Sequence, residues 1–260
     1  MNRHTRLLLK KISRAFYTFN MVDDGDRIAV AISGGNDSLS LLRLLQIRQS
    51  IMRENFELVA IHILGGMDGP STTGHKPLLE WLEASGVECI IKPMIVADDE
   101  KFPMDCYRCA WNRRSTLFRY TNRSECNKLA FGHHFDDMVE TGLMNLLYQG
   151  RMASMEPCAS YFKGKFHLIR PLVYATKKEI DKFAQSNEFP EPPPECPRSS
   201  KSKRKVIAEI LDLADHSYQN MRWNIFRAAM RCMELEEKAR TEDAENNELL
   251  ISAETKEYKE

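Results

Sequence analysis

The stretch IAVAISGGNDS occupies residues 28–38 and indicates the fold. Its first part, IAVAI, is apolar throughout, which is typical of a parallel strand that is buried on both faces. The two glycines allow backbone N–H groups to approach an anion closely, and a helix that starts after them adds partial positive charge at the same place. We therefore predict a strand, a phosphate-binding loop and a helix from about Ser38. The loop has neither the P-loop spacing nor the dinucleotide fingerprint, so an ordinary glycine-rich turn is the alternative on these residues alone.

The same order of strand and helix continues as far as Gly150. Apolar runs predict further strands at 58–63, 89–92 and 128–132, and periodic segments predict helices at 38–49, 77–85, 117–124 and 136–148. This alternation predicts an α/β fold with a Rossmann-like parallel sheet and helices on both faces. A basic amphipathic helix over 4–20 precedes it.

Beyond Gly150 the pattern changes to a small C-terminal helical region. Residues 169–172 are a strand or a loop, and Thr176 with Glu179 forms the capping box of a helix that reaches about residue 187. A loop over 189–197 contains five prolines, and two more helices are expected at about 205–214 and 217–238.

Composition and charge exclude several classes of protein. The 260 residues are 43% hydrophobic and 28% charged, which excludes a disordered or collagen-like chain. No stretch reaches the ~18 apolar residues that span a bilayer, and Lys10 and Lys11 interrupt the early leucine run of a would-be signal peptide, so we expect a cytoplasmic protein without a membrane span. Residues 234–260 hold ten acidic and four basic residues, which leaves a basic body. This distribution of charge is compatible with a nucleic-acid partner. The alternative is a solvated acidic tail on an otherwise ordinary surface.

Several motifs support a more specific interpretation. SGGxDS after a first strand resembles the pyrophosphate loop of the PP-loop ATP pyrophosphatase superfamily, whose members adenylate a carbonyl oxygen before a nucleophile displaces AMP. Further motifs follow in the order seen in the TtcA-type tRNA 2-thiocytidine synthetases, which sulfurate cytidine in a tRNA anticodon loop. These motifs are FNM (19–21), GDR (25–27), CYRC (106–109) followed by Arg113 and Arg114, GHHFDD (132–137), NLLYQG (145–150), IRPL (169–172) and NIFRA (224–228).

The resemblance covers about residues 5 to 230 and implies a domain organisation. It gives a PP-loop ATP-binding domain, adenine nucleotide alpha hydrolase-like, over 25–187, and a Cys/Pro loop with C-terminal helices over 188–238. The basic N-terminal helix takes 1–24, and we expect the acidic tail over 239–260 to be disordered.

The same resemblance implies an ATP and magnesium site. ATP would bind on Ser33, Gly34, Gly35, Asn36, Asp37 and Ser38, with Gly132 beside them and the main chain of Ala60 to His62 against the adenine. Asp136 and Asp137 would hold Mg²⁺, with N-capping of a helix as the alternative. His133 would line the adenylation site or be structural, and Asp37 would orient the loop or a metal.

Seven cysteines in a chain without an export signal indicate metal or redox chemistry rather than disulfides. The C-x-x-C of Cys106 and Cys109 lets two thiolates bind one metal, although a redox pair or half of a zinc site fits the spacing as well. The resemblance implies a 4Fe-4S cluster on Cys106, Cys109 and Cys196, with the fourth iron open to carry sulfide. The remaining cysteines, Cys89, Cys126, Cys158 and Cys232, are expected to be structural.

The chain departs from the family pattern at three places. Many relatives have a second C-x-x-C where this sequence has only Cys196, and many have lysine where it has Asn36. The segment Gly65–Gly69 also replaces the usual residues after the second strand. A cluster with three ligands tolerates the first departure, whereas a scheme with two cysteine pairs does not.

Two basic segments are candidates for contact with tRNA phosphates. Arg198, Lys201, Lys203, Arg204 and Lys205 lie together after Cys196, and the N-terminal helix carries five more cations. Arg113 and Arg114 join the RNA-binding set. A solvated face is the alternative for each segment. Tyr107 and Trp111, beside the C-x-x-C, either stack on a flipped base or pack in the core.

The sequence thus predicts an ATP-dependent tRNA sulfurtransferase, most simply for 2-thiolation of cytidine. ATP, Mg²⁺ and a 4Fe-4S cluster are the expected cofactors, tRNA and a sulfur donor such as a cysteine desulfurase the expected partners, and a homodimer is implied by similarity. Two alternatives stay open: a related enzyme acting on uridine or a small molecule, and an iron-sulfur redox sensor or RNA-binding protein that has lost ATP chemistry.

Overall fold

The structure is a computed structural model of the 260-residue chain. It describes all residues except 52–54, 195, 198–202, 216–217, 219 and 258–260, and describes side chains as far as residue 239. The chain divides into two compact units. The first comprises Met1–Asp136 and Glu156–Ser202, and the second comprises Asp137–Met155 and Lys203–Glu260.

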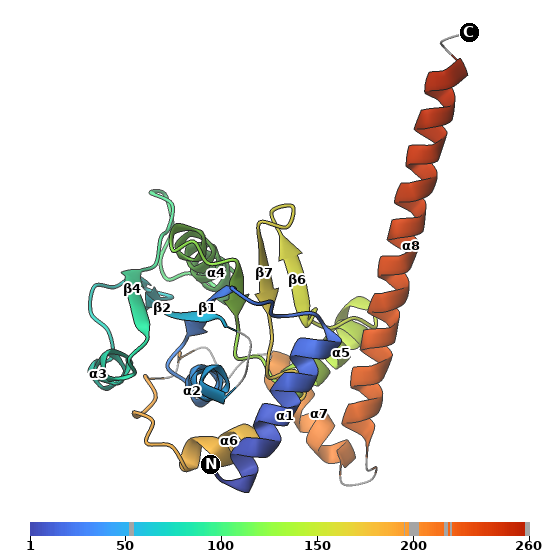
Figure 1. The fold of residues 1–260 in the computed structure, drawn as a ribbon. Coiled ribbons are helices and arrows are strands. Elements are labelled where there is room, and N and C mark those ends of the chain that lie inside the picture. The colour runs from blue at the N-terminus through green and yellow to red at the C-terminus, as the bar shows by residue number, and fades with distance from the viewer. Residues whose placement is uncertain (52–54, 195, 198–202, 216–217, 219, 258–260) are drawn as a thin grey trace. The chain divides into compact units, whose positions relative to one another are not determined.

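Helices and strands alternate along the chain (Figure 1). The helices are α1 (Arg3–Thr18), α2 (Asn36–Ile51), α3 (Lys76–Ala84), α4 (Cys106–Arg123), α5 (Phe135–Gln149), α6 (Lys177–Gln185), α7 (Lys203–Asp215) and α8 (Met221–Glu257). The strands are β1 (Arg27–Ile32), β2 (Glu57–Gly66), β3 (Gly69–Pro70), β4 (Glu88–Pro93), β5 (Lys128–Ala130), β6 (Cys158–Tyr161) and β7 (Phe166–Ile169).

The seven strands found in the described residues form a mostly parallel sheet in the first unit. Its order is β4-β2-β1-β5-β7-β6, with β3 paired antiparallel to the end of β2 and β6 antiparallel to β7. Strand β1 is parallel to both β2 and β5, with Val30 opposite Ala60 on one side and Ala130 on the other. The chain moves outward from β1 to β2 and β4, then returns to β5 on the other side. The predicted Rossmann-like α/β fold is confirmed.

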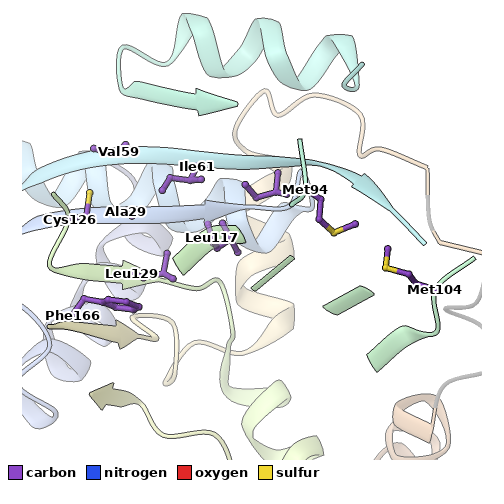
Figure 2. Packing of buried hydrophobic residues seen from close by; sticks show 11 residues of the cluster. Ala29, Val59, Ile61, Met94, Met104, Leu117, Cys126, Leu129 and Phe166 are labelled. Carbon is purple, nitrogen blue, oxygen red and sulfur yellow. The ribbon is translucent and has the colours of Figure 1, made fainter. Parts of the chain in front are cut away.

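Side chains on the two faces of the sheet build two layers of packing. Helix α4 covers one face, where Ala29, Val59, Ile61 and Leu117 belong to one buried hydrophobic cluster (Figure 2). Helix α2 lies on the opposite face and packs against α1 and α6 (Figure 1). Strands β1 and β2 are apolar on both sides because each side is covered by a helix, as expected for a parallel sheet.

The helix ends are set by capping residues. Thr176 and Glu179 form the predicted capping box of α6, with each side chain bonded to the other's backbone N–H. Asp105 caps α4, where its Oδ1 accepts a hydrogen bond of 2.7 Å from Arg108 N. This cap makes Cys106 the first residue of α4, whereas the sequence predicted a helix only from residue 117.

The second unit is built from helices. A Cβ built onto Gly142 of α5 would lie 3.6 Å from both Ala229 and Ile225 of α8, an ordinary contact distance that shows that these two helices pack against each other. Met233 of α8 accepts a bond of 3.3 Å from the backbone of Ser154, and Arg222 pairs with Asp212 of α7 at 2.7 Å.

The observed division differs from the predicted one at both ends of the central domain. The N-terminal helix is part of the first unit because it buries Leu8, Ile12 and Phe16. The Cys/Pro loop also belongs to this unit, while most of α5 belongs to the second. The segment 239–257, expected to be disordered, continues α8, and its many Ala, Glu and Leu residues favour a helix. Within the described part of the chain, no helix is long and apolar enough to cross a membrane.

Candidate functional site

The glycine-rich loop lies at the point where the sheet changes its direction of winding. Ser33 follows the end of β1, and Gly132 follows the end of the neighbouring β5. Because one strand leads away on each side of this point, a crevice forms outside the carboxyl ends, which is where open α/β sheets bind ligands. The predicted nucleotide site therefore falls at the expected place in the topology.

Serine hydroxyls hold the loop in a tight turn. Ser38 Oγ donates to Gly35 O at 2.9 Å and accepts from Ser33 N at 3.2 Å. Ser33 Oγ accepts from Gly35 N at 3.3 Å, and α2 starts at Asn36. The N–H groups of Ser38 and Leu39 donate to Gly35 O at 3.1 and 3.2 Å, and the N-terminus of α2 lies directly after the loop, as anion binding at a helix N-terminus requires.

Two glycines are needed because other chain segments approach them closely. Gly34 has φ +91°, and a Cβ there would lie 2.8 Å from Cδ of Pro193 and 2.9 Å from Leu78 Cδ2. A Cβ on Gly132 would lie 3.0 Å from the backbone carbon of Asp37. The loop is therefore enclosed by α3, by the residues after β5 and by the proline-rich segment.

Asp37 is the centre of a charged cluster. Lys177 Nζ donates to Asp37 Oδ1 at 2.7 Å and pairs with Asp181 at 3.0 Å. The buried His134 lies between two carboxylates, 3.9 Å from Asp37 and 3.8 Å from Asp136. Burial acts to lower the pKa of Lys177, but the hydrogen bonds and charges of Asp37 and Asp181 outweigh it and raise the pKa. A protonated amine thus stands beside the phosphate loop.

The two adjacent aspartates have different partners. Asp136 Oδ2 accepts a bond of 2.6 Å from the backbone N–H of Lys177 and so caps α6. Asp137 belongs to the second unit, where it lies 3.5 Å from Arg204. Asp136 therefore binds the first backbone N–H of α6, whose N-cap is Thr176, rather than capping its own helix.

His133 is held by its neighbours in the first unit. Its Nδ1 accepts a hydrogen bond of 3.2 Å from Arg170 Nε, and its ring stacks on Phe131. Arg170 in turn donates to the carbonyl of Glu156. The imidazole at the end of β5 is thereby fixed in orientation, which suits either of the two roles predicted for it.

The residues predicted to contact adenine, Ala60 to His62, lie in β2 opposite the last three residues of β1. Strand β2 extends to Gly66, so these residues lie in mid-strand, where Ala60 is buried and paired on both sides by β1 and β4. His62 Nδ1 donates to Ile32 O at 2.8 Å. Burial and the nearby charge of Arg113 lower its pKa, outweighing the bond to Ile32. Because His62 is opposite Ile32, these residues lie level with the carboxyl end of β1, and the adenine contact stays a prediction; β2 continues beyond them and ends at Gly66.

Arg113, predicted to bind RNA, instead completes that end of β2. Its guanidinium donates to the carbonyls of Ile63 at 3.1 Å and Gly65 at 2.6 Å. These residues lie past the end of the β1–β2 pairing at His62, where β2 is still paired with β4 and β3, so Arg113 has a structural function.

The proline-rich loop connects the phosphate loop with the cysteines. Pro193 packs on Gly34, and Glu191 O accepts a bond of 2.9 Å from His75 Nε2 before α3. Farther along the loop, Cys196 Sγ lies 4.0 Å from the sulfur of Met67. Met67 O accepts a bond of 2.7 Å from Met104 N, two residues before the C-x-x-C. One short segment thus contacts the phosphate loop and ends in the neighbourhood of Cys106.

The cysteines fall into two groups. Cys106 and Cys196 are exposed and Cys109 is half-buried, and Cys106 and Cys109 stand on one face in the first turn of α4. Burial raises the pKa of Cys89, Cys158 and Cys126, the last to about 11, despite the opposing effect of Arg27 on Cys126. The raised pKa values keep these three thiols protonated at neutral pH. Among the described residues, no three His, Cys, Asp or Glu side chains are close enough to hold a metal.

The remaining predicted RNA contacts are exposed. Arg114 is an exposed residue of α4, and Lys203, Arg204 and Lys205 are exposed in the first turn of α7. Arg198 and Lys201 lie outside the described residues. Tyr107 is 79% exposed and Trp111 50% exposed, with Arg108 5.0 Å above the Trp111 ring, so both aromatic rings face solvent rather than the core.

Sequence reasoning missed Lys177 as a member of the site. The signal for Lys177 was indirect. The capping box of α6 follows the last strand, β7, so α6 starts at the same edge of the sheet as the phosphate loop, and Lys177 is its first residue. Pro193 and Met67 were missed as well, because no local pattern reports a packing contact between distant segments.

Comparison with known proteins agrees with this fold and loop geometry. Residues 7–192 match the family described as the PP-loop domain, and the chain belongs to this family. Its curated relatives include the tRNA-cytidine(32) 2-sulfurtransferase of Shigella dysenteriae, 35% identical over 88% of this chain and 74% of that one. The enzyme of the same name from Erwinia tasmaniensis is 34% identical over 88% of this chain and 75% of its own. Within the PP-loop class, the chain therefore belongs with the tRNA-cytidine(32) 2-sulfurtransferases.

A solved structure shares the fold at greater distance. The U34-tRNA thiolase NcsA from Methanococcus maripaludis, solved with its 4Fe-4S cluster, superposes with a TM-score of 0.68 at 23% identity. The match covers 88% of this chain and 80% of that one, and it shows a common architecture.

Proposed function

We propose that this protein is an ATP-dependent tRNA sulfurtransferase that replaces the 2-oxygen of a cytidine with sulfur. The observation that carries the proposal is the path of the proline-rich loop. It contacts the phosphate loop through Pro193 and brings Cys196 to Met67, near the C-x-x-C. This path supports activation by ATP and delivery of sulfur within one unit of the protein, and the named relatives are tRNA-cytidine(32) 2-sulfurtransferases.

The proposed reaction has two steps. The 2-oxygen of the base attacks the α-phosphorus of ATP, the bond to the bridging oxygen breaks, and pyrophosphate leaves. Sulfide then attacks carbon 2, and the carbon–oxygen bond breaks as AMP leaves with the former base oxygen. Adenylation is needed because an oxygen bound to carbon is a poor leaving group until it carries a phosphoryl group.

The protein's own residues bind and orient the nucleotide. Backbone N–H groups of the loop and the first turn of α2 donate to the phosphates, and Lys177 adds a positive charge beside them. Asp37, Asp136 and Asp137 supply the carboxylates that Mg²⁺ prefers. Of these, Asp37 and Asp136 are linked through His134 and Lys177 in the same unit.

Cys106, Cys109 and Cys196 are the residues proposed to hold a 4Fe-4S cluster. The donor set fits such a group, because soft thiolates suit iron-sulfur clusters, and two of the three thiols, Cys106 and Cys196, are exposed. When bound, the cluster would supply sulfur in the form of sulfide. A cysteine desulfurase is the proposed source of that sulfur, the cytoplasm is the proposed compartment, and a homodimer is the proposed assembly.

Reconstitution of the full chain tests this function. We expect unmodified tRNA, ATP-Mg²⁺ and a sulfide source to yield 2-thiocytidine in nucleoside mass spectrometry, with release of pyrophosphate. The anaerobically purified protein should contain about four iron and four acid-labile sulfide per chain. Cys196→Ala should lose both the iron and the product, while the matched Cys158→Ala should keep them.

Several results would contradict the proposal. Thiouridine in place of thiocytidine would overturn the choice of base, and zinc in place of iron would overturn the cluster. A protein that binds tRNA but releases no pyrophosphate would be an RNA-binding protein without the ATP chemistry.

A further inference from the structure

The outer side of helix α1 carries an unusual row of positive charge. The helix contains Arg3, Arg6 and Lys10, and no acidic residue occurs among its 16 residues. These three side chains follow at spacings of three and four residues and so share one face. All are exposed, whereas the opposite face is buried through residues such as Leu8 and Ile12. Like charges at these spacings repel one another, so the row is not explained by the stability of the helix.

Helix α6 extends this row to a second element. The two helices pack against each other (Figure 1), and His4 Nε2 lies 2.7 Å from the carbonyl of Glu179. Lys182 of α6 then joins the cations of α1 around a hollow of about 650 Å³. The residues that line it are Arg3, His4, Arg6, Leu7, Lys10 and Lys182.

The carboxylates of α6 do not neutralise this hollow. Glu179 accepts two hydrogen bonds from Lys11, at 2.6 and 2.7 Å, and also closes the capping box. Asp181 pairs with Lys177 at 3.0 Å. Within the part of the chain that the structure describes, the four lining cations have no carboxylate partner. The hollow therefore offers four free positive charges and no acidic lining residue.

The dimensions suit a run of nucleic-acid phosphates better than one small anion. From Arg3 to Lys10 the helix rises about 10 Å. Successive phosphates of one strand of a duplex advance by about 3.4 Å along its axis, so the row can face about three of them. Long, flexible cationic side chains on a helix can contact the phosphate backbone of a nucleic acid without contacting its bases. Such contacts position the nucleic acid but do not recognise its sequence.

We propose that this α1–α6 hollow, lined by Arg3, Arg6, Lys10 and Lys182, binds the phosphate backbone of the substrate tRNA. The inference rests on the proposed function for the identity of the polyanion. The hollow holds the tRNA body, while the target base is recognised elsewhere. Loss of its charge should therefore weaken tRNA binding without changing the chemistry of a bound tRNA.

A variant with four substitutions tests the surface in the full-length protein. We compare R3A/R6A/K10A/K182A with K92A/R119A/K163A/K165A, a control that removes the same charge from exposed positions of the same unit. Filter binding of unmodified tRNA is measured over a range of NaCl concentrations. The hollow variant should bind at least tenfold more weakly, and the slope of log K against log salt should fall by about 3, since each lost phosphate contact removes about 0.7–0.9.

Thiolation by the same proteins separates this surface from the reaction. The hollow variant should show a raised KM for tRNA, an unchanged kcat at saturating tRNA and an unchanged KM for ATP. If the two variants have equal affinities for tRNA and equal slopes of log K against log salt, the proposed tRNA-binding role of the hollow is wrong, even if thiolation proceeds. Binding of anionic vesicles, but not tRNA, through these four residues would also overturn it. If wild type binds tRNA through the hollow but makes no thionucleoside, the surface stands and the proposed reaction fails.

Discussion

The amine of Lys177 lies 2.7 Å from a carboxylate oxygen of Asp37, although 140 residues separate them in the chain. Lys177 is the first residue of α6 and Asp37 is in the first turn of α2. The pair thus joins the starts of two helices that begin at the same edge of the sheet, where the phosphates of a nucleotide would bring further negative charge.

Lys177→Ala should raise the KM for ATP about tenfold, because a hydrogen bond to a charged group contributes about 1.5–3 kcal/mol when its partner is left unpaired. Steady-state kinetics at saturating tRNA measure the effect. Lys177→Arg should recover part of the affinity. Lys76→Ala is the matched control, since Lys76 also starts a helix and pairs with the residue four positions on, Glu80 at 3.5 Å. An equal effect of both alanine variants would show that the contact with Asp37 is unimportant.

Gly34→Ala should destabilise the protein, whereas Gly35→Ala should not. Gly34 has positive φ and its Cβ would lie 2.8 Å from Pro193, while a Cβ on Gly35 finds its nearest neighbour at an ordinary 3.6 Å. We expect the first substitution to lower the free energy of unfolding by about 2 kcal/mol. Urea denaturation compares the two variants, and equal midpoints would contradict the close approach of the proline-rich loop.

Acid should remove the contribution of the Lys11–Glu179 pair to stability. Burial acts to raise the pKa of Glu179, but the bonds from Lys11 and Thr176 outweigh it and lower the pKa below its ordinary 4.5. The pair therefore stabilises the fold above about pH 4.5 and loses its effect as the pH falls through the lowered pKa. Glu179→Gln should lower the free energy of unfolding by about 1 kcal/mol at pH 7 and leave it unchanged at pH values below the lowered pKa of Glu179. Urea denaturation at each pH measures this free energy. Glu80→Gln, in an exposed pair, should cost little at any pH.

Alkylation should distinguish the accessible cysteines from the buried ones in protein stripped of metal. The thiolate is the reactive form, and burial raises the pKa of Cys126 to about 11. At pH 8, iodoacetamide should therefore modify the exposed Cys106 and Cys196 well before Cys126. Mass spectrometry of digested samples gives the order, with urea-unfolded protein as the control. Early labelling of Cys126 would contradict its burial.

The strands and most helices could be predicted because their signals are local. A parallel strand covered on both faces has to be apolar throughout, and IAVAI at 28–32 shows this directly. The hairpin of β6 and β7 was missed because its strands are short and its turn, at Phe162 and Lys163, has positive φ without glycine at either position. The start of α4 was missed because residues 106–116 are largely polar and only the cap at Asp105 marks the helix.

The candidate site was predictable where a motif lies in one segment and was missed where segments meet. The glycine-rich loop and the capping box of α6 are sequence patterns with a physical cause. The contact of Lys177 with Asp37 and the function of Arg113 at the end of β2 depend on how distant segments pack. The sequence predicts the end of the second strand at Ala60 to His62, because it does not show that β2 continues to Gly66.

The proline-rich loop acts as a spacer of fixed maximum length. Cys196 follows Pro193, which lies against the phosphate loop, by only three positions, and an extended chain spans at most about 3.3–3.6 Å per residue. The two ends are therefore within about 11 Å of each other in any conformation of the segment. In the proposed reaction, a base activated at one end therefore needs no domain movement to meet sulfur at the other, and the adenylate is exposed to water only briefly.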